Sequence, residues 1–141
     1  MGLSIAAAAA IIGVSSLIAL GAVIGSVLPA TSNYADSFKS MKSRAINQIQ
    51  TDIDITSVAT PANASNYDLN ITLKNIGSTV LKTSDFNILV NGTNQEFVCK
   101  NMYLYPESTI YFNVYDLPGE GSRKLKVVSD NGISDYYEYT I

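Results

Sequence analysis

The chain has 141 residues, enough for a membrane anchor and one globular domain but too few for two ordinary domains. Its net charge of −3 and its pI near 4.7 argue against nucleic-acid binding, for which a basic surface is expected. The sequence has no histidine and one cysteine, Cys99, so it lacks the commonest general base and cannot form an internal disulfide. We expect a binding or structural protein with no catalytic residue, no metal site and no cofactor.

Residues 5–28 form an apolar run of Ala, Ile, Val, Leu, Gly and Ser without a charge or a proline. As a helix this run would be about 36 Å long, enough to cross a hydrocarbon core of about 30 Å. A cleaved signal peptide fits less well, because no basic segment precedes the run and its apolar core is too long. We predict a transmembrane helix in residues 1–31 that contacts membrane lipid through residues 5–28.

Gly21 and Gly25 form a GxxxG motif in this helix, which places two glycines on one face and lets a partner helix approach closely. The motif predicts dimerisation through this face. The alternative is that small residues are simply abundant in the helix.

The orientation of the helix in the membrane is ambiguous from the charges. Lys39, Lys42 and Arg44 follow the apolar run, and the positive-inside rule would place the C-terminal domain in the cytoplasm. The N-terminal flank is very short and these basic residues begin about ten residues beyond the membrane, so the rule is weak evidence here.

Residues 32–50 are predicted to continue the helix as a polar stalk. One interpretation is a helix that rests on its own domain, and the other is a short coiled-coil neck that continues the glycine contact. Both depend on a row of apolar residues with spacings of 4, 3, 4 and 4, which is Tyr34, Phe38, Met41, Ala45 and Ile49.

From residue 51 the hydrophobic period changes to 2, which is typical of half-buried strands. Asn91-Gly92 predicts a two-residue hairpin that returns through Phe97 and Cys99, and Asn131-Gly132 predicts a second hairpin. We predict that residues 51–141 form an all-β, immunoglobulin-like antiparallel sandwich. Its expected strands contain Ile53 and Ile55, Tyr67–Leu73, Phe86–Val90, Ile110–Val114, Leu125–Val127 and Tyr137–Ile141.

Several tyrosines are candidates for a partner surface, because tyrosine offers a large contact area with a polar tip. Tyrosine is equally favoured on any exposed β surface, so an ordinary strand face is the alternative. The candidates are Tyr103, Tyr105, Tyr111, Tyr115, Tyr137 and Tyr139.

Three N-glycosylation acceptors occur at Asn63, Asn70 and Asn91. Chance alone gives roughly two such motifs in a chain of this composition, so they are compatible with export without indicating it. Asp52 and Asp54 share one face of a predicted strand, but no loop with calcium-ligand spacing accompanies them. We interpret these two residues as part of a solvated face.

The MGLS start, the alanine-rich helix, the polar stalk and the β domain together resemble the FlaF family of archaellum accessory proteins. Residues 70–81 (NITLKNIGSTVL) and 104–110 (LYPESTI) are similar to the strand-turn-strand pattern of that family. The resemblance covers essentially the whole chain.

This resemblance implies a single-pass anchor in the archaeal cell membrane, with the β domain outside the cytoplasm. There the domain would bind the surface-layer protein or a sister archaellum accessory protein and act as a stator element of the motility machinery. The resemblance also implies a homodimer.

Two other classes of protein remain open. A filament subunit of archaellin or type IV pilin-like type also joins an apolar helix to a β head. The precursor of such a subunit carries a basic residue and a glycine before the helix, where this sequence has Met1-Gly2. A membrane-tethered solute- or sugar-binding module is the second class, although the sequence shows no signature of a concave site. An enzyme is the least favoured.

Overall fold

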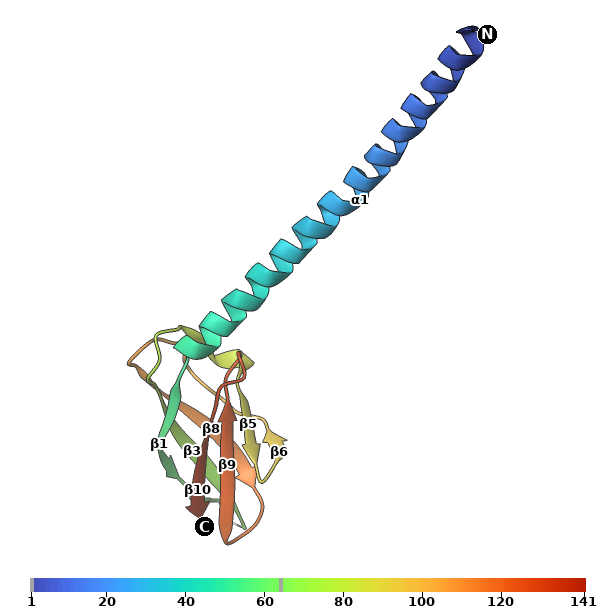
Figure 1. Ribbon diagram of the computed structural model, residues 1–141. Coiled ribbons are helices and arrows are strands. Elements are labelled where there is room, and N and C mark those ends of the chain that lie inside the picture. The colour runs from blue at the N-terminus through green and yellow to red at the C-terminus, as the bar shows by residue number, and fades with distance from the viewer. Residues whose placement is uncertain (1, 64) are drawn as a thin grey trace. The chain divides into compact units, whose positions relative to one another are not determined.

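A 49-residue helix, α1 (Gly2–Gln50), precedes antiparallel sheets in the computed structural model, which describes residues 2–63 and 65–141 (Figure 1). Met1 of the Met1-Gly2 start and Ala64 of the Asn63-Ala64-Ser65 acceptor lie outside these residues. The chain divides into two compact units, Met1–Ser43 and Arg44–Ile141. The predicted stalk, residues 32–50, therefore spans both units.

The N-terminal part of α1 is long and apolar enough to cross a membrane. Two of its serines are hydrogen-bonded within the helix. The hydroxyl groups of Ser15 and Ser16 donate to the carbonyl oxygens of Ile11 and Ile12, at 2.6 and 2.8 Å. A hydroxyl that is hydrogen-bonded within its own helix needs no partner from the lipid.

The sandwich has two principal sheets, and every strand pair in them is antiparallel. In the first sheet, β3 lies between β1 and β8, and β2 pairs with the start of β3. The second sheet has the order β10-β9-β5-β6, and β4 pairs with β7 at the side. The bounds are β1 (Ile53–Ala59), β2 (Ala62–Asn63), β3 (Asn66–Asn75), β4 (Leu81–Lys82), β5 (Asn87–Val90), β6 (Thr93–Gln95), β7 (Tyr103–Leu104), β8 (Thr109–Leu117), β9 (Ser122–Val128), β10 (Ser134–Thr140) and the 3₁₀ turn η1 (Thr83–Asp85).

The core lies between the two sheets and is made by the alternate residues of each strand. Phe112 is fully buried near its middle, with ring centroids 5.3 Å from Phe86 and 5.0 Å from Phe97. The predicted sandwich is confirmed, and its immunoglobulin-like classification stays a prediction. The largest fully buried side chains are Tyr67, Leu69, Ile71, Leu73, Leu81, Ile88, Leu104, Ile110, Phe112, Val114, Leu125 and Val127.

The Asn91-Gly92 hairpin is confirmed. Val90 pairs with Thr93 across a two-residue loop, and Asn91 and Gly92 have φ angles of 49° and 84°, as a type I′ turn requires. The predicted return through Phe97 and Cys99 is wrong. The returning strand β6 ends at Gln95, and the next residues cross to the first sheet, where Val98 bridges to Asn113 on β8.

The second predicted hairpin joins β9 to β10, but its loop is longer than two residues. Val128 pairs with Ser134, and the backbone N–H of Ser129 donates to the carbonyl oxygen of Ile133 at 2.8 Å. Gly132 has a φ of 86° in this turn. The longer loop places Asn131 against the end of α1, as described below.

Candidate functional site

The predicted tyrosine surface divides into exposed and buried members. Tyr103, Tyr105, Tyr111 and Tyr115 are exposed. Tyr139 is 7% exposed, so its assignment to a partner surface is wrong. It occupies an inward position of β10, where its side chain belongs to the core.

Tyr137 has the same inward parity as Tyr139 and is partly buried against the core. Tyr136, which is not among the predicted surface tyrosines, points outward and is 52% exposed. The signal was present in the sequence: if Tyr137 and Tyr139 face the core, the alternation along a strand places Tyr136 outside.

The outer face of the first sheet carries Tyr111 and Tyr115 beside the acceptor Asn70. Tyr111 pairs with Thr72 on β3, and Asn70 pairs with Asn113 on β8. Asn70 is exposed in the middle of the sheet. A glycan on Asn70 would therefore cover the tyrosines, so the predicted glycosylation of Asn70 and the predicted partner surface on this face exclude each other.

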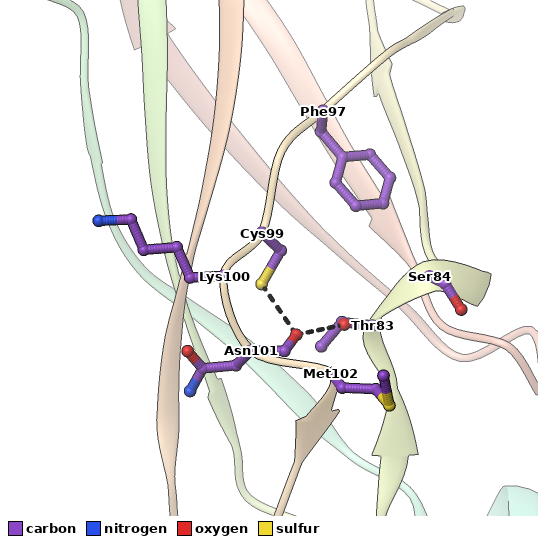
Figure 2. A pocket seen from close by; sticks show the side chains of 7 residues that line it. All are labelled: Thr83, Ser84, Phe97, Cys99, Lys100, Asn101 and Met102. Carbon is purple, nitrogen blue, oxygen red and sulfur yellow. Dashed lines mark hydrogen bonds between the residues drawn. The ribbon is translucent and has the colours of Figure 1, made fainter.

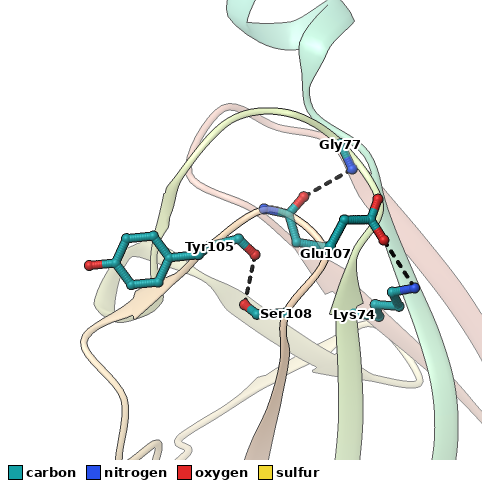
Figure 3. A network of polar contacts seen from close by, with 6 residues as sticks. Lys74, Gly77, Tyr105, Glu107 and Ser108 are labelled. Carbon is teal, nitrogen blue, oxygen red and sulfur yellow. Dashed lines mark hydrogen bonds and ion pairs between the residues drawn. The ribbon is translucent and has the colours of Figure 1, made fainter.

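A second exposed group surrounds β7. The rings of Tyr103 and Tyr105 lie 6.4 Å apart, and Met102 precedes them with an exposed side chain. The carbonyl oxygen of Tyr105 accepts from the hydroxyl of Ser108 at 2.7 Å, which holds the turn after β7 (Figure 3). The Tyr105 ring points away from this turn into solvent (Figure 3).

The end of α1 is joined to the sandwich by backbone hydrogen bonds. The N–H groups of Ile76 and Gly77 both donate to the carbonyl oxygen of Asp52 at 3.0 Å, and that of Ser78 donates to Gln50 at 2.8 Å. The loop itself is held by the Asn75 side chain, whose Oδ1 accepts from the Gly77 N–H at 3.0 Å.

The side chain of Thr51 completes this joint. Its hydroxyl lies 2.7 Å from the carbonyl oxygen of Asn47 and 2.6 Å from the hydroxyl of Thr79, and it accepts from the amide of Asn131. Gln48 in turn donates to the Asn131 carbonyl oxygen at 3.0 Å. Residues from the helix, the 75–79 loop and the β9–β10 turn therefore meet at one buried threonine.

A shallow hollow lies beside Cys99 (Figure 2). The Cys99 thiol is partly buried and donates to the carbonyl oxygen of Asn101 at 3.4 Å, and the Thr83 hydroxyl donates to the same oxygen. In the described part of the chain, no ionisable side chain is hydrogen-bonded to the thiol. The hollow has a volume of about 350 Å³ and is lined by Thr83, Ser84, Phe97, Cys99, Lys100, Asn101 and Met102.

Within residues 2–63 and 65–141, no group of three or more His, Cys, Asp or Glu side chains could hold a metal ion. Asp52 and Asp54 are both exposed, and Asp54 lies opposite Lys74 in the sheet. Lys74 itself pairs with Glu107 at 3.3 Å (Figure 3).

The two contact faces suggested for the helix do not coincide. A Cβ at Gly21 or Gly25 would meet only open space, so this face is free in the monomer. At 3.6 residues per turn, the Gly21–Gly25 face lies roughly 150° around the helix from the exposed Tyr34, Phe38 and Met41. A single straight partner helix would therefore not contact both faces, and the coiled-coil neck stays a prediction.

The last part of the stalk, from Arg44 onward, belongs to the same compact unit as the sandwich. Its apolar row does not pack on the sandwich there. Ile49 is 85% exposed, although it is one residue from the end of α1. The interpretation of this face as a helix packed on its own domain is therefore wrong at this position. The side chain of Ile49 is available to a partner.

Comparisons with known proteins identify the fold. No protein-family model and no curated protein matches the sequence. The structure is similar to the archaellum periplasmic stator protein FlaG from Sulfolobus acidocaldarius, with 18% identity and a TM-score of 0.51, over 63% of this chain and 99% of that one. It is also similar to a chain of the archaeal flagellum of Methanospirillum hungatei strain JF1, with 16% identity and a TM-score of 0.57, over 92% of this chain and 93% of that one.

The two matches cover different shares of the molecule. The flagellum match leaves only 8% of this chain uncovered, so it includes most of α1 as well as the sandwich. The FlaG match covers nearly the whole of that stator protein and about two thirds of this chain. At these identities the likeness establishes a shared fold.

Proposed function

We propose that this protein is a non-catalytic, membrane-anchored component of the archaeal motility machinery. Its sandwich lies outside the cytoplasmic membrane, binds the surface layer or a sister accessory protein, and acts as a stator element. The observation that carries the proposal is the fold shared with a periplasmic stator protein over 99% of that protein's chain. The apolar part of α1 supplies the anchor.

The joint between α1 and the sandwich supports this role. A stator element resists a load, so its binding domain needs a firm attachment to its anchor. Here the helix reaches the first strand without a Gly- or Pro-rich linker, and the carbonyl oxygens of Gln50 and Asp52 accept hydrogen bonds from the 76–78 loop. A force on the sandwich is thereby passed to the end of the helix through the continuous chain and through the hydrogen bond from Ser78 to Gln50.

A filament subunit is the second candidate, and the flagellum match favours it because that match takes in most of the helix. In that role α1 would pack against helices of neighbouring subunits. The exposed apolar side chains along the stalk would then be buried in the filament.

Cosedimentation separates the two functions. The full-length protein in uncharged lipid nanodiscs is mixed with isolated surface-layer sheets or with detached filaments, and empty nanodiscs serve as the blank. We expect the protein to sediment with the sheets. Immunolabelling of cells supplies the second measurement, and label along the length of the filaments would contradict the stator role and establish a filament subunit.

The tyrosines on the first sheet offer a matched pair of variants for this assay. If this face binds the sheets, Tyr111→Ser together with Tyr115→Ser will abolish cosedimentation. Tyr103→Ser together with Tyr105→Ser changes the same number of exposed tyrosines around β7 and serves as the control. Loss of binding in the control pair alone would show that the partner surface lies around β7 and not on the first sheet.

A further inference from the structure

The outer face of the second sheet carries a cluster of two lysines and a tyrosine. Lys124 and Lys126 occupy alternate positions of β9, and Tyr136 on β10 pairs directly with Lys126. The two ammonium nitrogens lie 5.3 and 5.1 Å from the centroid of the Tyr136 ring. Both positive charges are therefore gathered around one exposed aromatic ring.

This positive cluster is unexpected on an acidic domain. Residues 51–141 hold eleven acidic and six basic side chains, and two of the six basic ones are adjacent here. Neighbouring like charges on a sheet face repel each other. Lys124 lies 3.8 Å from Glu138, but both side chains are largely exposed and such pairs contribute little. In residues 2–63 and 65–141, Lys126 forms no ion pair that would offset this repulsion.

The local potential also acts on the tyrosine hydroxyl. Hydrogen bonding from Lys126 lowers the pKa of Tyr136 below its ordinary value, the slight burial of the ring opposes this shift, and the positive charge of Lys126 adds to it. The same field that favours a phenolate favours any anion that enters beside the ring.

The cluster borders a hollow with a volume of about 400 Å³, which is within the usual range for small-molecule sites. Leu89 is half-buried in it, and the Asn91-Gly92 turn forms one rim. This rim is held in place, because Asn91 Oδ1 accepts from the Lys124 N–H at 2.9 Å and the Asn91 N–H donates to the Lys124 carbonyl oxygen at 2.9 Å.

We propose that this hollow binds a carboxylate-bearing saccharide. The carboxylate lies between the ammonium groups of Lys124 and Lys126, and the apolar face of the sugar ring packs against Tyr136 and Leu89. The combination favours a sugar over an acidic peptide, because an Asp or Glu side chain has no flat apolar face to match the aromatic ring. This binding site does not rest on the stator role.

The test is calorimetric titration of the full-length protein in uncharged lipid nanodiscs with trigalacturonic acid. The protein comes from a host that does not N-glycosylate, because Asn91 on the rim is itself an acceptor candidate. We expect the acid to bind and its neutral methyl ester to bind at least about tenfold more weakly, since the ester cannot form charge-assisted hydrogen bonds. Saturation-transfer NMR should show transfer from the protein to the sugar-ring protons.

Matched variants locate the site. Lys126→Gln should weaken binding by about tenfold, whereas Lys100→Gln, which removes the same charge beside the Cys99 hollow, should leave it unchanged. Tyr136→Ser should reduce the NMR transfer, and Tyr111→Ser, at another exposed strand position, should not. Circular dichroism confirms that each variant is folded.

Three results would overturn the proposal. The first is the absence of binding to the wild-type protein. The second is equal binding of a pentaglutamate peptide or of inorganic phosphate, which would make the hollow an unselective anion site. The third is an equal effect of Lys100→Gln and Lys126→Gln, which would show that binding depends only on the net charge of the protein.

Discussion

The hydroxyl groups of Tyr67 and Tyr139 form a hydrogen bond of 2.9 Å between the two sheets, and both side chains are buried. One hydroxyl donates to the other within the buried space between the sheets. A buried polar group that loses its partner costs more than the hydrogen bond itself contributes, and this asymmetry makes the pair measurable.

Tyr139→Phe should lower the free energy of unfolding by about 1–3 kcal/mol, because the Tyr67 hydroxyl is left buried without its partner. Tyr67→Phe should have a similar effect. The double variant should be less destabilised than the sum of the two, since neither hydroxyl remains. Urea denaturation followed by circular dichroism measures all three. Strictly additive effects would show that the two hydroxyls do not interact.

Stability should also fall in alkaline solution. Burial, and then the hydrogen bond with Tyr67, raise the pKa of Tyr139 above its ordinary value of 10.0. Above pH 10 the unfolded chain releases this proton and the folded protein retains it, so the free energy of unfolding decreases as the pH rises. The slope attributable to Tyr139 approaches about 1.4 kcal/mol per pH unit. Tyr139→Phe should have a shallower slope over the same range, and an unchanged slope would contradict the assignment.

At the scale of elements, the joint between α1 and the sandwich depends on a glycine. A Cβ at Gly77 would lie 2.6 Å from the carbonyl oxygen of Gln50 and close to the backbone of Asp52. The Gln50 oxygen accepts from the Ser78 N–H, and the nearby Asp52 atom also belongs to the backbone, so neither can move aside cheaply.

Gly77→Ala should therefore destabilise the protein by about 1–3 kcal/mol, as overpacking does. Thermal unfolding followed by circular dichroism measures the change. Gly13→Ala introduces the same methyl group where a Cβ meets only open space, and it should leave the unfolding of the sandwich unaffected. A Gly77→Ala variant as stable as the wild type would mean that the loop can retreat from the helix end.

The apolar part of α1 supplies a second prediction at this scale. If the GxxxG face mediates dimerisation, Gly21→Leu together with Gly25→Leu should abolish crosslinking in membranes, because bulky side chains prevent close helix approach. Gly13→Leu adds a leucine roughly 100° around the helix from that face and should leave the dimer intact. Unchanged crosslinking in the double variant would assign dimerisation to the stalk row or to the sandwich.

For the whole molecule, the basic residues after the apolar part of α1 and the proposed function disagree about orientation. The positive-inside rule places the sandwich in the cytoplasm, and a stator role requires it outside. We expect protease added to intact cells, after removal of the surface layer, to digest the sandwich without lysis. Protection until the cells are lysed would contradict the extracytoplasmic orientation, and a cytoplasmic marker protein controls for leakage.

Much of this architecture was predictable because it depends on local patterns. An uncharged run of apolar residues defines the candidate membrane helix, and period-2 alternation locates the strands. The Asn91-Gly92 turn was also predictable, since few residues other than Asn and Gly accept the positive φ angles of a type I′ turn. The tyrosine surface was less predictable, because the six candidate tyrosines look alike in the sequence and yet some lie in the core and others in solvent.

Other features depend on partners distant in the sequence, which no local pattern specifies. Asn131 was correctly placed in a hairpin, but its contact with Thr51 arises only when the β9–β10 turn reaches the helix end. Cys99 was expected in a returning strand, yet the chain leaves the second sheet before it. The Lys126–Tyr136 cluster joins two strands whose register decides which outward side chains meet. Hydrophobic periodicity thus determines the elements and their inward faces, whereas the pairing of those elements determines which polar groups combine into a site.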